Sequence, residues 1–177
     1  MKTIAVLTAV LLLTLTTNAG PPDGCDDWSI HGYWIGMSFD EAEQVRPIKR
    51  KSNGQLVVKE KGQYKGYLTF DYDGLIRYGA DFNSGALGQK GSPQHAQAAT
   101  ILKERFGEPF DTMRTESWNA MTGNTKVVAP YWFSEECDSL IAVQSITAGD
   151  SIKVTQTAVI LRRYSNWKAS RSGTMLD

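Results

Sequence analysis

Short runs rich in β-branched and aromatic residues, separated by turn-forming residues, are the feature that most constrains the fold of this sequence. The runs predict strands. Glycine, asparagine and aspartate between them, as at Asp73-Gly74 and Gly149-Asp150, predict tight turns. Because two strands joined by a tight turn pair antiparallel, the sequence predicts an antiparallel sheet. The predicted strands are residues 55–60, 64–71, 75–82, 112–118, 126–134, 140–147 and 152–163.

Two segments carry the start and end signals of helices. The first opens with the capping-box pair Ser38 and Glu41 and is expected to end just before Pro47, which disfavours helical geometry in its predecessor. The second opens at Ser92-Pro93, with proline at the first helical position, and closes at Gly107. Its apolar stripe is formed by Ala98, Ile101, Leu102 and Phe106.

The hairpin around Gly74 has a predictable register. A three-residue loop ending at Gly74 pairs Leu68 with Tyr78 and Phe70 with Ile76, which puts apolar side chains on one face. A two-residue turn would instead place an arginine opposite Phe70. We predict the three-residue loop, because its third residue adopts the left-handed conformation that glycine allows.

Helix, strands, helix, strands is the order of elements that these signals predict. The fold class is α+β, with two short helices packed on a twisted antiparallel sheet. Residues 20–164 are expected to form a single domain of two αβββ-type modules in tandem, about 34–82 and 92–164. A chain of 177 residues that is 41% hydrophobic suits one such domain. Residues 165–177 lack periodicity and are expected to form a flexible tail.

The first nineteen residues have the pattern of a secretory signal peptide. Lys2 precedes an apolar run over 4–15, and small residues lead to a cleavage site between Ala19 and Gly20. The run is shorter than a membrane span requires, so we expect no membrane span. The residues before Cys25 do not suit lipidation. The sequence therefore predicts a secreted or periplasmic protein.

Export determines how the cysteines are interpreted. Cys25 and Cys137 are the two cysteines of the chain, and in an oxidising compartment such a pair predicts a disulfide. The alternative is a metal site formed by Cys25 with Asp26, Asp27 and His31, which lacks a second paired ligand motif. We expect no metal and no cofactor.

The charge balance and the absence of catalytic motifs exclude several functions. The chain has 19 Lys and Arg against 19 Asp and Glu, so it is not a strongly basic nucleic-acid binder. The sequence contains none of the common nucleotide-binding, zinc-protease or hydrolase motifs. A Cys25 or Ser29 nucleophile activated by His31 is an alternative, and so is a cation site or glycosidase pair among Glu135, Glu136 and Asp138. We expect no catalytic residue, and expect these acids to be solvated.

Five aromatic residues form a candidate interaction surface. Tryptophan and tyrosine are favoured anchors at protein interfaces, and neighbouring aromatic residues on one strand point to opposite faces. The competing interpretation is that most of them fill the core. The five are Trp28, Tyr33, Trp34, Tyr131 and Trp132.

Two short motifs resemble those of small bacterial envelope modules. The first helix opens with Gly36-Met37-Ser38-Phe39-Asp40-Glu41, and the second ends with Leu102-Lys103-Glu104-Arg105-Phe106-Gly107-Glu108-Pro109. These are similar to the Gly-Met-Ser/Thr helix start and Gly-x-Pro helix end of SmpA/OmlA-type outer-membrane assembly lipoproteins and of beta-lactamase inhibitor protein. The outline covers residues 34–163, without the lipidation site of the former or the longer helices of the latter. The resemblance implies a secreted α+β protein that holds another protein on a sheet face or loops.

The sequence thus predicts an exported, non-enzymatic protein-interaction module, such as an inhibitor or an envelope-assembly factor, with an unknown protein partner. The alternative is a small secreted hydrolase or carbohydrate-binding protein. Exposed aromatic residues that line a cleft with convergent carboxylates would favour the alternative.

Overall fold

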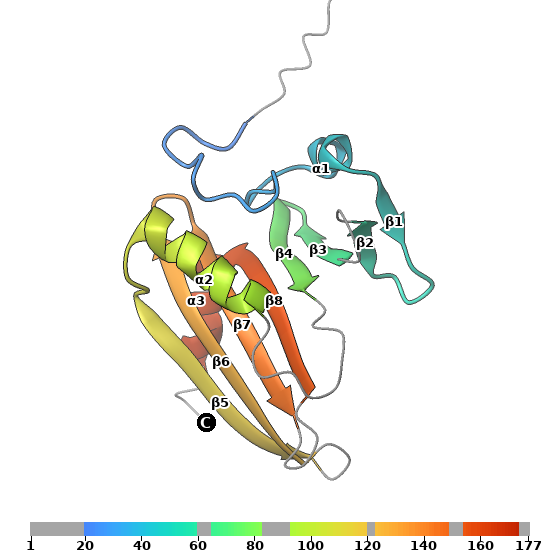
Figure 1. Ribbon diagram of the computed structural model, residues 1–177. Helices are drawn as coiled ribbons and strands as arrows, with labels where there is room; N and C mark the ends of the chain where they lie inside the picture. The colour runs from blue at the N-terminus through green and yellow to red at the C-terminus, as the bar shows by residue number, and fades with distance from the viewer. Residues whose placement is uncertain (1–19, 60–64, 83–92, 120–122, 149–153, 174–177) are drawn as a thin grey trace, which may run out of the picture.

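One antiparallel sheet of eight strands and three helices make up the described part of the chain (Figure 1). The computed structural model describes residues 20–59, 65–82, 93–119, 123–148 and 154–173. The chain is therefore α+β, and the seven predicted strands are confirmed over the described residues; residues 60, 64 and 152–153 of the predicted ranges lie outside them. The elements are α1 (Phe39–Val45), β1 (Ile48–Arg50), β2 (Leu56–Lys59), β3 (Lys65–Asp71), β4 (Gly74–Phe82), α2 (Pro93–Phe106), β5 (Asp111–Asn119), β6 (Gly123–Ser134), β7 (Ser139–Ala148), β8 (Val154–Arg163) and α3 (Tyr164–Gly173).

The strand order is β1-β2-β3-β4-β8-β7-β6-β5, so β4 and β8 meet at the centre of the sheet. Consecutive strands are antiparallel neighbours within each half, and β4 pairs antiparallel with β8 across the middle. The short strand β1 was not predicted, since its three residues include Lys49 and Arg50 and carry no strand pattern. We call the β4–β8 pairing the central seam.

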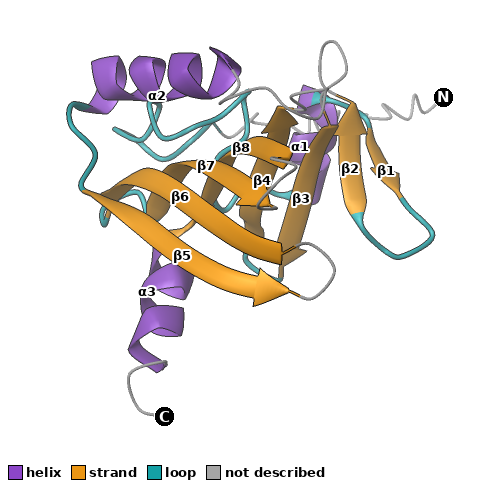
Figure 2. Cartoon of the chain, turned by 60° about the horizontal axis from the view of Figure 1, so that its bottom comes forward, coloured by secondary structure: helices purple, strands orange, loops and turns teal. Residues whose placement is uncertain are grey.

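Helices lie on both faces of the sheet. Helices α1 and α2 are on one face and α3 is on the other (Figure 2). Under α1 and α2 lies the main core, which is built from alternate residues of the strands, such as Tyr78 and Leu161, together with Leu102 of α2 and the N-terminal residues Tyr33 and Met37. A smaller apolar cluster packs under α3 and consists of Ala129, Tyr131, Leu140, Ala142, Tyr164 and Trp167.

The helix signals in the sequence are largely confirmed. Ser38 caps α1 with a capping box in which its backbone N–H donates to Glu41 (2.8 Å), and Pro47 follows the last turn. Helix α2 begins at the predicted proline and ends before Gly107, whose φ is +80°. Ser92 lies outside the described residues. Ile101 is 47% exposed, contrary to prediction, because the buried stripe is narrow and centres on Leu102.

The hairpin register is confirmed except at the turn. Leu68 pairs with Tyr78 as predicted, and Gly74 has a φ of +106°. Phe70, however, pairs with Leu75, so the prediction that it pairs with Ile76 was wrong. A β-bulge leaves Ile76 without a partner and shortens the connection to a two-residue turn. The bulge turns Leu75 into the core, where it is fully buried.

The predicted tail is instead a helix as far as Gly173. Tyr164 and Trp167 of α3 are buried against the sheet, which fixes the helix in place. Its first turn is capped by Asp138, a residue of the β6–β7 turn, which accepts hydrogen bonds from the backbone N–H (2.6 Å) and hydroxyl (2.8 Å) of Ser165. The sequence did not reveal this helix because its cap lies far away along the chain. Residues 174–177 lie outside the described part.

The disulfide between Cys25 and Cys137 is present, with a Cα–Cα distance of 5.7 Å. It joins residues 20–37, which we call the N-terminal segment, to the β6–β7 turn across a sequence separation of 112 residues. The N-terminal segment also packs on α2, where Trp28 stacks on Phe106 with ring centroids 4.5 Å apart. These contacts hold an irregular segment over the main core.

Replacing Gly74 with alanine should lower the free energy of unfolding by roughly 2–6 kcal/mol, from positive-φ strain and overpacking together. A Cβ at this position would overlap the backbone of Gly36 and Met37. The matched control is Gly54→Ala, which has a similar φ of +82° but nothing within 4 Å of the new Cβ, and which should cost only about 1–2 kcal/mol. Equal losses in urea denaturation would contradict the proposed overlap.

Reducing the disulfide should lower the free energy of unfolding by about 4–5 kcal/mol, because the bridge closes a long loop in the unfolded chain. Urea denaturation of oxidised and reduced protein measures the difference. A thiol reagent should label neither Cys25 nor Cys137 before reduction and both afterwards. Labelling of native, air-oxidised protein would contradict the bridge.

Candidate functional site

The centre of the sheet has one covered and one open face. Along β4 and β8, Tyr78 and Leu161 point into the main core and are fully buried. Because side chains alternate along a strand, those of Arg77 and Ile160 point to the opposite face, where Gly79 also lies. Among the described elements, α3 packs on that face against β7 and β8 but does not extend over β3 and β4. We call this region the open face.

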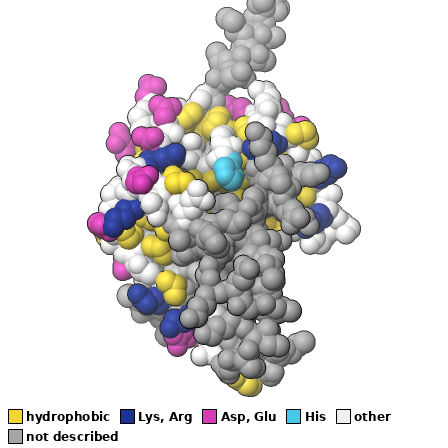
Figure 3. All heavy atoms as spheres, in the orientation of Figure 1, with side chains coloured by type: hydrophobic (Ala, Val, Ile, Leu, Met, Phe, Trp, Pro, Cys, Tyr) yellow, Lys and Arg dark blue, Asp and Glu magenta, His cyan; other side chains and the backbone are white. Residues whose placement is uncertain are grey.

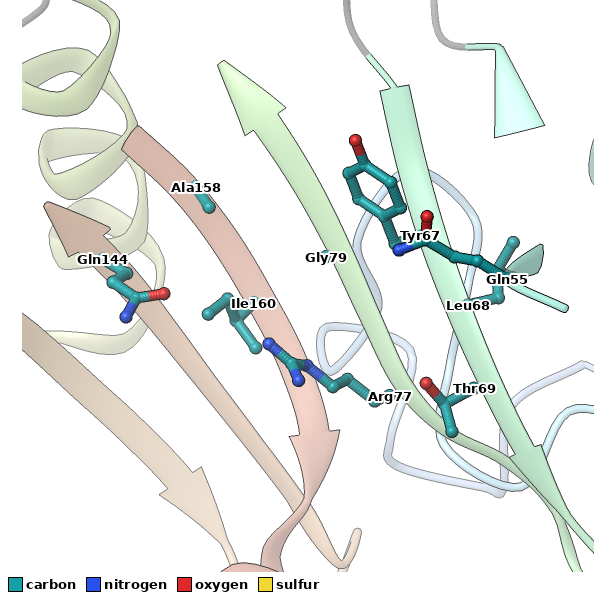
Figure 4. A pocket seen from close by; sticks show the side chains of 9 residues that line it. All are labelled: Gln55, Tyr67, Leu68, Thr69, Arg77, Gly79, Gln144, Ala158 and Ile160. Carbon is teal, nitrogen blue, oxygen red and sulfur yellow. The ribbon is translucent and has the colours of Figure 1, made fainter. Parts of the chain in front are cut away.

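A hollow of about 340 Å³ lies on the open face (Figure 4). Its walls come from both halves of the chain, because β3, β4 and the residue before β2 contribute on one side of the central seam and β7 and β8 on the other. The side chain of Arg77 extends from β4 toward Ile160 on β8. The floor is formed by Gly79, Ala158 and Ile160, and the rim by Gln55, Tyr67, Thr69, Arg77 and Gln144.

Gly79 lines this hollow without a side chain. A Cβ at Gly79 would meet no atom within 4 Å, and the backbone there does not have the positive φ that requires glycine. Glycine inside a strand weakens the strand and often marks a place where another molecule approaches the backbone. Neither the backbone conformation nor the packing explains glycine at this position.

Two arginines stand side by side on the open face. Arg77 and Arg162 are cross-strand partners in the β4–β8 pairing. Burial of Arg162 and the charge of Arg77 lower the pKa of Arg162. Within the described part of the chain, neither arginine forms a salt bridge or side-chain hydrogen bond. By contrast, Arg163 lies 3.3 Å from Asp71 and 3.8 Å from Asp138.

The chemistry of the hollow suits binding. Its described lining offers amide, hydroxyl and guanidinium groups, and includes no carboxylate, imidazole or thiol. A nucleophile and a neighbouring base are therefore not brought together among these residues. The face that carries α1 and α2 differs from the hollow in its charges, because acidic and basic side chains are interspersed over its described surface (Figure 3).

Three of the five aromatic residues predicted as an interaction surface are buried. Tyr33, Tyr131 and Trp132 are buried, with exposures of 0%, 2% and 4%. Trp28 and Trp34 are partly buried against the main core. The prediction of an interaction surface was wrong for these three residues, because Tyr33 and Trp132 belong to the main core and Tyr131 belongs to the cluster under α3.

The residues around His31 are held by structural contacts. Cys25 is in the disulfide, and Ser29 donates its hydroxyl proton to the backbone oxygen of Asp26 (3.1 Å). The His31 ring is hydrogen-bonded to the hydroxyl of Tyr78 (2.9 Å). No group of three or more metal-ligating side chains occurs among the residues that the structure describes.

The acidic residues near Cys137 mainly hold α3. Asp138 caps the helix, and Glu135 accepts hydrogen bonds from Lys168 (3.1 Å) and Tyr164 (3.3 Å). Glu136 is exposed. Two of the three acids are thus engaged in the fold, which does not favour a glycosidase pair.

Comparison with known proteins identifies no relative. No family model matches the chain, and neither the curated proteins nor the solved structures contain a significant match. Among the described helices, none is long and apolar enough to cross a membrane.

Arg77, Gly79 and Arg162 were not among the site residues predicted from the sequence. The alternating pattern of β4 could have placed Arg77 and Gly79 on the face opposite Tyr78. Nothing local could have placed Arg162 beside Arg77, since that neighbourhood depends on the β4–β8 pairing.

His31 should make the protein less stable in acid. Burial and the charge of Arg46 lower the pKa of His31 in the folded protein below its usual 6.5. The unfolded chain therefore binds the proton first, so stability is highest above pH 6.5 and falls as the pH decreases below it. The His31→Asn variant tolerates the φ of +55° and does not titrate. Between pH 7.5 and 5.5, the urea concentration at the midpoint of unfolding should fall less for this variant than for the wild type. An equal decrease for the two proteins would contradict this prediction.

Proposed function

We propose that this protein is an exported, non-enzymatic interaction module that binds a protein partner on its open face. The observation that carries the proposal is the hollow over Gly79. At this part of the sheet, Gly79 is required by neither the backbone nor the packing, and two arginines lie side by side. Both features lower the stability of the sheet. A bound partner would explain why the surface has them.

The arrangement of the strands supports two tandem modules. Each half of the chain has a helix followed by four antiparallel strands, and the last strands of the halves, β4 and β8, pair at the central seam. The hollow draws residues from both halves, so the binding surface depends on their union. The same order of elements fits the proposed resemblance to SmpA/OmlA-type and beta-lactamase inhibitor protein modules. An inhibitor or envelope-assembly role would use such a surface.

Two observations support export. The disulfide suits an oxidising compartment. The leader pattern over residues 1–19 predicts cleavage before Gly20, although those residues lie outside the described part of the chain. We therefore propose a secreted or periplasmic location.

Carbohydrate binding is the second candidate, and Tyr67 is the observation that favours it. Its ring borders the hollow, whose lining also includes the amides of Gln55 and Gln144, and an aromatic ring together with amides can hold a sugar. No described lining residue is a carboxylate, which gives the hydrolase version less support.

The Gly79→Phe variant tests the proposal by filling the hollow. The variant should fold, because a Cβ at Gly79 meets no atom within 4 Å. The amount of partner protein that it captures should be at least ten-fold lower than for the wild type. The chain from Gly20 is immobilised and exposed to an extract of exported proteins, and bound protein is quantified by mass spectrometry. Ala169→Phe, on the exposed surface of α3, is the matched control and should capture as the wild type does.

Unchanged capture by Gly79→Phe, or no captured protein at all, would contradict the proposal. Retention of a glycan that Gly79→Phe abolishes would establish the carbohydrate-binding alternative.

A further inference from the structure

The uncompensated pair of arginines at the central seam indicates what the open face binds. Arg77 and Arg162 face each other across β4 and β8 on the same face of the sheet. Like charges directly opposite each other on neighbouring strands destabilise a sheet. Arg162 is half-buried between Arg77 and Leu140, its partners on the two sides, so water screens its charge less than it would at the surface.

The neighbouring Arg163 shows that this fold neutralises arginines elsewhere. It points to the opposite face and lies within 4 Å of carboxylate oxygens of Asp71, Asp73 and Asp138. Among the described residues, no carboxylate is placed in this way beside Arg77 or Arg162. Within the described part of the chain, these two guanidinium groups therefore have no carboxylate at salt-bridge distance.

We propose that the pair formed by Arg77 and Arg162 binds a carboxylate of an acidic loop on the partner protein, with the loop seated over Gly79. This inference rests on the proposed function and adds the chemistry of the partner. Guanidinium groups bind carboxylates with paired, charge-assisted hydrogen bonds. The amides and hydroxyl of Gln144, Gln55 and Thr69 line the rim for the polar backbone of that loop.

A protein carboxylate fits these observations better than a nucleic acid. The hollow of about 340 Å³ holds only a few side chains, and a single pair of arginines is too short to follow a phosphate backbone. The chain also has no net positive charge. Binding should weaken as salt increases, because the contact is between charges.

The Arg77→Glu variant places a carboxylate of this chain where the partner's carboxylate would bind. It should raise the melting temperature, because a cross-strand ion pair with Arg162 replaces a repulsion. It should also lower capture of the partner at least ten-fold in the assay with immobilised protein. The matched control is Arg114→Glu, which makes the same change of charge on the exposed edge strand β5 and should leave capture unchanged.

A direct probe is a synthetic peptide of alternating glutamate and glycine, with a glutamine counterpart. Only the glutamate peptide should shift the NMR signals of the Arg77 and Arg162 side chains, and Arg77→Glu should abolish that shift. Equal shifts with both peptides, or shifts with inorganic phosphate alone, would overturn the assignment to a protein carboxylate.

The failures of the two proposals are distinguishable. If Gly79→Phe blocks capture but Arg77→Glu does not, the open face binds a partner but the carboxylate inference is wrong. If neither variant affects capture, the proposed function itself is wrong. A lower melting temperature for Arg77→Glu would overturn the repulsion on which the inference depends.

Discussion

The antiparallel pairing of β4 with β8 is the interaction on which the rest of the structure depends. It joins two helix-and-strand halves into one sheet, and it places Tyr78 of β4 and Leu161 of β8 in the same core. Helix α1 has only seven residues and contributes a single buried residue, Ala42. The first half therefore completes its core with side chains from the second, including Leu102 of α2.

The irregular N-terminal segment is the second structural necessity. It supplies Ile30, Tyr33, Ile35 and Met37 to the main core, although it contains no helix and only one isolated β-bridge. Ordering this segment costs conformational entropy, which its contacts with the rest of the fold must offset. The disulfide and the stacking of Trp28 on the second helix hold it at two points.

The open face is where the structure departs from what stability alone would select. Gly79 weakens the strand at the centre of the sheet, and Arg77 and Arg162 repel each other across the central seam. The well-packed core beneath these residues tolerates both features. Local features that oppose stability tend to occur where a protein functions, which is why we place the binding site here rather than among the buried aromatic residues.

The sequence by itself determined the elements whose signals lie within a few residues, such as the Ser38 cap, the end of α2 at Gly107 and seven of the eight described strands. It also determined the disulfide, since only two cysteines can pair. The tertiary structure alone decided the β4–β8 pairing, the capping of α3 by Asp138 and the meeting of Arg77 with Arg162. These contacts join residues far apart in the chain. Strands of similar composition do not specify locally which neighbour they will pair with, so the partner is chosen by how the whole core packs.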